Sequence, residues 1–141
     1  MSTSDPGGQR LFTLEEANAI VEQITPLLER LRQEHAALME ARQTFGEYAN
    51  NLRNHGFLVE GHRVESEISE HIARLRGGIE SIADLGVEIK NLEWGLVDFP
   101  ALRNGEIVYL CWRLDEGPIS YWHDLDAGFA GRQPVDDGFD S

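Results

Sequence analysis

The sequence predicts an α+β fold in which a long antiparallel two-helix hairpin is followed by a three-stranded antiparallel β-meander. Three observations lead to this prediction. Apolar residues recur every three or four positions through the first two thirds of the chain, as on one face of a helix. After residue 95 the period changes to two, which is typical of strands with one buried face. Asn104-Gly105 separates two such alternating runs and is the strongest short signal for a β-hairpin turn.

The predicted helical hairpin extends from about residue 13 to about residue 92. Thr13 and Glu16 have the spacing of a capping box, in which each side chain accepts a hydrogen bond from the other residue's backbone N–H. Residues 50–62 are rich in Asn and Gly and are expected to hold the turn. Two long helices cannot by themselves cover the apolar faces of both. We therefore expect the helix pair to pack on the C-terminal part, on a second copy, or on both. The stripes include Val21, Ile24, Leu28, Leu31 and Leu38 in the first helix and Ile68, Ile72, Leu75, Ile79, Ile82 and Leu85 in the second.

The meander is predicted over residues 96–126, and its turns determine which side chains share a face. The Asn-Gly turn pairs Asp98 with Cys111. A second turn, at residues 115–118, is expected to pair Leu110 with His123, which places His123 on the apolar face. The opposite, mixed face then carries Asp98, Tyr109, Cys111, Arg113, Trp122 and Asp124.

The domain is predicted to cover residues 11–134, with a Gly-rich strap over 127–134. Residues 1–10 are rich in Ser, Gly and Pro and are expected to form a disordered lead-in. Residues 135–141 contain three aspartates and no base, and they are expected to be a frayed acidic tail.

The charge of the chain argues against nucleic-acid and membrane partners. Its 141 residues include 25 Asp+Glu and 12 Lys+Arg, a formal net charge of -13, whereas phosphate binding requires a basic stripe. No apolar run approaches the ~20 residues of a membrane span and the N-terminus lacks a signal-peptide pattern, so we expect a cytoplasmic protein. Seven acids and one base lie between residues 115 and 141, which favours a cationic or basic partner at this C-terminal edge.

Several C-terminal motifs together resemble one family. They are GLVDFPA at 95–101, VYLCWRL at 108–114, YWH at 121–123 and DAGFAGRQP at 126–134. With these motifs the chain resembles the prokaryotic DUF2203 family of domains of unknown function, over nearly its whole length. The resemblance implies no particular activity, substrate or cofactor.

The helical histidines are possible but poor metal ligands. Glu67 precedes His71 by one turn, which is a carboxylate–histidine half-site. His35 would lie about seven residues away from His71 along the pair, roughly 10 Å, so one ion cannot bridge the two histidines. The more common arrangement is a polar cluster of Arg42 with Glu67, Glu70 or His71 that fixes the register of the helices.

His123 and Cys111 have alternative interpretations. His123 has Glu116, Asp124 and Asp126 nearby in sequence and could ligate a divalent metal, but a buried histidine bonded to a backbone carbonyl is more common. Cys111 could be a nucleophile, but its neighbour Asp98 disfavours the thiolate, and a half-buried strand cysteine is the simpler interpretation.

The mixed face and the strap supply the remaining candidates. Asp98, Arg113 and Trp122 would form either a ligand platform or a subunit interface. Asp126 belongs to the same candidate pocket, and Arg132 could receive an anion or clamp a nearby acid.

Two functions follow from these candidates. The first is a homodimeric interaction or scaffold module that pairs through the helical hairpin, favoured because no known catalytic motif is present. The alternative is a metal-binding or small-ligand-binding protein or enzyme, with its site between the meander and the second helix.

Overall fold

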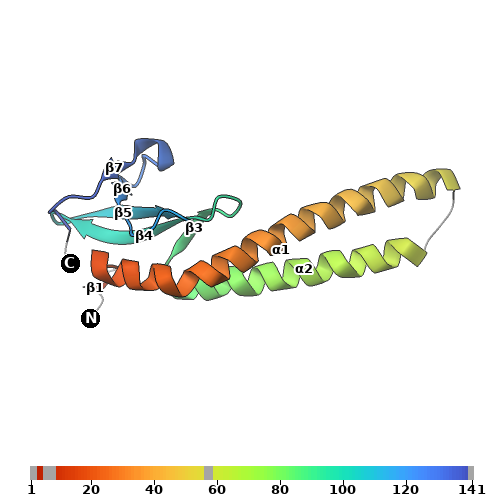
Figure 1. Cartoon of the computed structure of the whole chain (residues 1–141), viewed down its shortest axis with the longest axis horizontal. Coiled ribbons are helices and arrows are strands. Elements are labelled where there is room, and N and C mark those ends of the chain that lie inside the picture. The colour runs from red at the N-terminus through yellow and green to blue at the C-terminus, as the bar shows by residue number, and fades with distance from the viewer. Residues whose placement is uncertain (1–2, 5–8, 56–58, 140–141) are drawn as a thin grey trace.

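The computed structural model describes residues 3–4, 9–55 and 59–139, and its two long helices lie side by side with a sheet at one end (Figure 1). α1 covers Leu14–His55 and α2 covers Val59–Asp84. The main sheet contains β3 (Glu88–Asn91), β4 (Leu96–Arg103), β5 (Glu106–Arg113), β6 (Tyr121–His123) and β7 (Gln133–Pro134). The predicted α+β class is therefore confirmed.

The start of α1 forms as its sequence predicts. The Thr13 N–H donates to Glu16 Oε1 at 2.9 Å, and the Glu16 N–H donates to Thr13 Oγ1 at 3.0 Å. These two bonds are the predicted capping box, and they satisfy amides that have no partner within the helix.

The two helices run in opposite directions and approach closely near Gly78. A Cβ at that position would lie 2.4 Å from Leu31 Cδ2, so the glycine permits the contact. Farther along, Glu34 on α1 bonds His71 and Arg74 on α2. The turn expected within residues 50–62 is narrower than predicted, because α1 continues to residue 55 and α2 begins at residue 59; the connection at 56–58 lies outside the described residues. Neither helix, over its described residues, carries an apolar stretch that could cross a membrane.

The sheet has five antiparallel strands in the order β3-β4-β5-β6-β7, so the predicted three-stranded meander is wrong in extent. The three central strands were predicted, whereas β3 and β7 add one strand at each edge. These edge strands have four and two residues, too few for an alternating pattern to be recognised. A separate two-stranded sheet pairs β1 (Thr3–Ser4), within the predicted disordered lead-in, with β2 (Arg10–Leu11).

The register of the first hairpin is confirmed and that of the second is wrong by one residue. Asp98 pairs with Cys111 as predicted. Leu110, however, pairs with Trp122 rather than with His123. In the connection before β6 the Glu116 N–H donates to the Arg113 carbonyl at 3.1 Å, so the chain turns at residues 113–116 and not at the predicted 115–118, and the Ile119 N–H donates to Asn18 Oδ1 on α1 at 2.8 Å. Because side chains alternate along a strand, this single step exchanges the faces of Trp122 and His123.

One face of the sheet builds the core with α1 and α2. Trp122 belongs to this face with an exposed fraction of 5%, and Phe99 packs edge to face on Phe12 at 5.3 Å between ring centroids. The buried cluster includes Ile24 and Leu28 of α1, Ile82 of α2, and Val97, Phe99, Val108, Leu110, Trp112 and Trp122 of the sheet.

The C-terminal segment covers the other face of the sheet (Figure 1). Residues 124–132 connect β6 to β7 and contain a short 3₁₀ helix, η1, at Phe129–Gly131. From here on the strap means this connection, 124–132, in place of the predicted 127–134. The tail beyond β7 differs from the expected frayed segment over its described residues. Asp136 pairs with Arg103 at 2.5 Å, and the Phe139 ring lies 6.1 Å from that of Trp122.

Candidate metal centre

Three chemically active side chains meet on the mixed face of the sheet. Asp98 of β4, Cys111 of β5 and His123 of β6 lie on adjacent strands, and their potential ligand atoms are all within 4.8 Å of one another. They are 1%, 1% and 2% exposed. We call these three residues the Asp-Cys-His cluster; it is the only group of three or more potential metal ligands found among the described residues.

The ring of His123 is held at both nitrogens. Nδ1 lies 2.8 Å from the carbonyl oxygen of Asp124, and Nε2 lies 3.0 Å from Asp98 Oδ2. A carbonyl oxygen can only accept, so Nδ1 carries the proton that it donates. Nε2 therefore points at the carboxylate, and a single proton on either group would complete a hydrogen bond between them. A histidine fixed in this way through Nδ1 presents Nε2 as a metal ligand would.

The Asp98 carboxyl is buried and incompletely bonded. Oδ2 meets His123, whereas Oδ1 has no hydrogen-bond partner among the described residues. Burial raises the pKa of Asp98, and the neighbouring His123 opposes that rise. A buried carboxylate oxygen without a partner is unfavourable, and a cation beside it would remove that cost.

Cys111 is not placed as a nucleophile. Burial, and after it the negative charge of Asp98, raises the pKa of the Cys111 thiol from 9.0 to about 12. Reactive cysteines instead have a lowered pKa in an electropositive setting. The thiol is therefore protonated at neutral pH, which agrees with a buried strand cysteine, and only a strong Lewis acid would favour its thiolate.

A cavity of about 280 Å³ adjoins the cluster beneath the strap. Asp98 and His123 line it from the sheet, together with Lys90 and Tyr109. The strap supplies the facing wall. The full lining is Lys90, Leu96, Asp98, Tyr109, His123, Leu125, Asp126, Ala127, Gly128 and Phe129. None of these residues belongs to α2, so this cavity lies between the sheet and the strap, whereas the sequence predicted a site between the sheet and the second helix.

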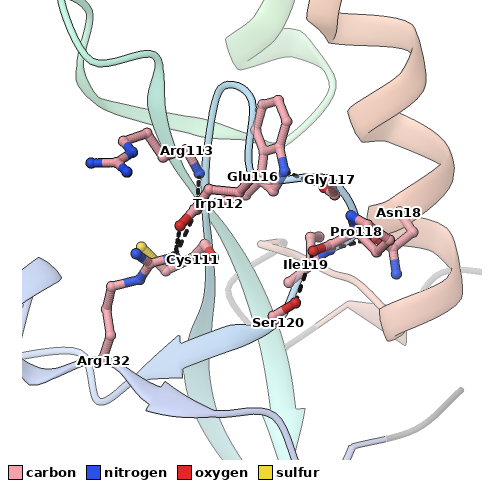
Figure 2. A network of polar contacts seen from close by, with 10 residues as sticks. All are labelled: Asn18, Cys111, Trp112, Arg113, Glu116, Gly117, Pro118, Ile119, Ser120 and Arg132. Carbon is pink, nitrogen blue, oxygen red and sulfur yellow. Dashed lines mark hydrogen bonds and ion pairs between the residues drawn. The ribbon is translucent and has the colours of Figure 1, made fainter.

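Arg132 holds the end of the strap against the sheet (Figure 2). One of its terminal nitrogens, Nη2, lies 2.7 and 2.9 Å from the two oxygens of Glu116. Glu116 Oε1 also accepts the Arg113 N–H at 2.6 Å. The guanidinium stacks over the Tyr121 ring at 4.1 Å. Arg132 is thus engaged with Glu116 through Nη2, whereas its buried Nε has no hydrogen-bond partner among the described residues.

The other predicted site residues lie in three different settings. Asp126 lines the cavity from the strap and is exposed. Arg113 is exposed on the mixed face with its guanidinium 5.8 Å from the Phe129 ring, and among the described residues it forms no ion pair with Asp98. Trp122 is in the core, so its predicted place on a ligand platform is wrong, for the register reason given above.

The helical candidates do not form a metal half-site. His71 Nδ1 bonds Glu34 Oε1 on the other helix, and Arg74 Nε bonds the same oxygen at 2.9 Å. Glu67 is exposed. His71 does lie in a polar cluster, but its partners are Glu34 and Arg74 and not the predicted Arg42, Glu67 or Glu70. Arg42, expected in that cluster, is exposed.

Sequence reasoning missed Cys111 as a ligand and Lys90 as a cavity residue, whereas it placed Tyr109 on the mixed face that lines the cavity. The Asp98–Cys111 pairing was available from the Asn-Gly turn and was the one signal that could have identified Cys111. Lys90 lies on β3, which was not predicted as a strand.

The comparisons with known proteins give one match. The family described as "Uncharacterized conserved protein (DUF2203)" matches residues 10–135, a range that includes the whole main sheet, the cluster and the strap. No curated protein and no solved structure matches the chain.

Proposed function

The chain belongs to the DUF2203 family, and from the geometry of its site we propose that it binds a divalent transition metal, Zn²⁺ in the first place, through Asp98, Cys111 and His123. The observation on which this proposal rests is the burial of a carboxylate, a thiol and an imidazole with their ligand atoms within 4.8 Å of one another.

The donor set selects the class of metal. Thiolate and imidazole ligands suit Zn²⁺ and its neighbours in the first transition row, whereas Mg²⁺ and Ca²⁺ prefer an all-oxygen shell. Donor atoms around a tetrahedral zinc ion lie roughly 3.3–3.8 Å apart, as follows from bonds of about 2.0–2.3 Å. Nε2 and Oδ2 are 3.0 Å apart and the remaining separations are up to 4.8 Å, so shifts of about 1 Å would bring the three atoms into range.

The charge of the buried cluster also favours a divalent ion. A proton in the contact between His123 and Asp98 and the thiol proton of Cys111 are the two protons that a metal ion would displace. Replacing these two protons by one divalent cation leaves the buried charge unchanged. Asp98 Oδ1 would at the same time gain a positive neighbour, where it now has no bonding partner among the described residues.

The test is metal binding by the full chain prepared without an affinity tag. Elemental analysis is expected to find one zinc or similar ion per chain. Co²⁺ added to the metal-free protein should produce tetrahedral visible bands and a thiolate-to-cobalt charge-transfer band. Cys111→Ser should abolish the charge-transfer band, and Asp98→Asn should weaken binding by about 10-fold or more.

The matched control is His71→Gln, which removes a partly buried histidine that also bonds a carboxylate. This variant should bind Co²⁺ like the unmodified chain, and circular dichroism should show that every variant is folded. Failure of the folded protein to bind Zn²⁺, Co²⁺ or Ni²⁺ at micromolar concentration would overturn the proposal. So would a charge-transfer band that survives in Cys111→Ser.

A second candidate function is self-association through the helix pair, as a scaffold module in the cytoplasm. The long helices extend well beyond the sheet (Figure 1), and Met39 and Ile79 expose 40% and 39% of their surface on them. Sedimentation at micromolar concentration should then give a dimer that Met39→Glu weakens. A monomer under these conditions would rule out the dimeric scaffold without affecting the metal proposal.

A further inference from the structure

We propose that the cavity beneath the strap is the pocket of a small monocarboxylic acid with a short apolar body, whose carboxylate binds the metal held by the Asp-Cys-His cluster. This inference rests on the proposed metal function and adds to it the chemical class of a second ligand.

A ligand in the cavity would have access to the metal. The cluster offers three protein ligands, and three ligands with one open position are the arrangement of catalytic and ligand-binding zinc sites, whereas structural zinc sites have four protein ligands. Asp98 and His123 both line the cavity. A molecule in the cavity therefore reaches the donors that would hold the ion, and a cavity of about 280 Å³ is at the lower limit of the roughly 300–1,000 Å³ of typical ligand sites.

The metal ion and the charged residues around the cavity determine the charge of the ligand. An ammonium group has no lone pair for a metal and stays protonated at neutral pH, whereas a carboxylate can bind the ion directly. Lys90 lines the cavity with its Nζ 4.9 Å from the centroid of the Tyr109 ring, and it supplies the permanent positive charge among the described lining residues. Lys90 is also paired with Glu88 at 3.0 Å, and Asp126 adds a negative charge to the strap wall. These two acids outnumber Lys90, so the attraction for a carboxylate comes from the metal ion, and a second negative charge on the ligand would be unfavourable.

The apolar lining of the cavity determines the rest of the ligand, beyond its carboxylate. Leu96, Leu125 and Phe129 line the cavity with apolar surface, to which the Tyr109 ring adds. Leu125 is 51% exposed in the structure, so a ligand body packed against it would remove apolar surface from water. A bare acetate would not use this wall.

The experiment follows the visible spectrum of the Co²⁺-loaded full chain during titration with four probes. The first is 4-methylpentanoate, which combines one carboxylate with a short apolar body. Acetate lacks the body, 3-methylbutylamine lacks the carboxylate, and glutarate has two carboxylates. We expect 4-methylpentanoate to shift the cobalt bands and to bind roughly tenfold more tightly than acetate or glutarate. The amine should leave the bands unchanged.

Two variants test the apolar wall and the charged side of the pocket separately. Leu125→Ala should weaken 4-methylpentanoate by roughly fivefold and leave acetate unchanged, because it shortens only the apolar wall. Lys90→Gln should weaken both carboxylates by a similar factor. Arg76→Gln, which removes one exposed positive charge on α2 outside the cavity lining, is the control and should change neither.

The outcomes distinguish failure of the pocket assignment from failure of the metal proposal. If Co²⁺ does not bind with a thiolate charge-transfer band, the metal proposal fails and the pocket assignment fails with it. If Co²⁺ binds with that band but 4-methylpentanoate does not move the cobalt spectrum, only the pocket assignment is overturned. An equal response to the amine, or a Leu125→Ala variant that binds 4-methylpentanoate as tightly as the parent chain, would also overturn it.

Discussion

Cys111 in the folded, metal-free chain should react with a disulfide reagent about a thousandfold more slowly, at about pH 8, than in the unfolded chain. The pKa of its thiol rises from 9.0 to about 12 on folding, through burial first and the charge of Asp98 second. Because only the thiolate attacks, a rise of about three units lowers the reactive fraction by about three orders of magnitude. The same rise means that charging this thiol in the empty site costs about 4 kcal/mol more than in water, which a bound metal must offset.

The assay is simple because Cys111 is the only cysteine of the chain. Ellman's reagent gives the rate in native buffer and in concentrated guanidinium chloride, and Cys111→Ser supplies the blank. Limited access to a buried thiol also slows the native reaction, so the pH dependence is the decisive measurement. The native rate should increase about tenfold per pH unit well past pH 9, where the rate in the unfolded chain reaches its plateau.

Two outcomes would contradict this reasoning. A native rate within about tenfold of the unfolded rate would show that the thiol is neither buried nor opposed by Asp98. A plateau near pH 9 in the native chain would show that its pKa is not raised. Stoichiometric Zn²⁺ should slow the native reaction further, because the metal holds the sulfur.

Two other predictions concern the fold that supports the site. Gly95→Ala should lower the free energy of unfolding by about 2 kcal/mol, since Gly95 has a φ of +62° and a Cβ there would lie 2.7 Å from Leu114 Cβ. Gly77→Ala in α2, where nothing lies within 4 Å, is the control and should be neutral or slightly stabilising in the same denaturant titration. The pKa of Glu34 is lowered from 4.5, chiefly by its bond to His71, so this carboxylate stabilises the fold above that value and the contribution is lost as the pH falls through the lowered pKa. Glu34→Gln should therefore reduce stability by less than about 1 kcal/mol at neutral pH, and thermal melts of the two proteins should converge in acid; a difference that persists in acid would contradict the assignment.

The parts of the fold that depend on local chemistry could be predicted from sequence. The capping box at Thr13 and Glu16 is defined within four residues, and the Asn-Gly turn fixes the pairing of Asp98 with Cys111 without any distant contact. The edge strands could not be predicted in the same way. β7 has two residues, and its place beside β6 depends on the whole strap folding back over the sheet.

The candidate site was only half predictable, because the register of β6 depends on a turn and on a long-range contact that the sequence pattern did not indicate. Asp98 and His123 were both recognised as chemically interesting residues, yet the predicted register placed them on opposite faces. The connection before β6 turns at residues 113–116, where the Glu116 N–H donates to the Arg113 carbonyl, and Ile119 is held by Asn18, 101 positions away. Sequence periodicity carries no information about such a contact.

The same hydrogen bond links the site to the rest of the molecule. Asn18 lies on α1, and it bonds the connection that determines which face His123 occupies. In the predicted register His123 would face the apolar side and Trp122 would lie beside the strap. In the observed register Trp122 is buried in the core and His123 lies beside Asp98. Among the described residues the helix pair contributes no ligand to the cluster and no residue to the cavity lining, but Asn18 bonds the connection that leads into β6 and His123.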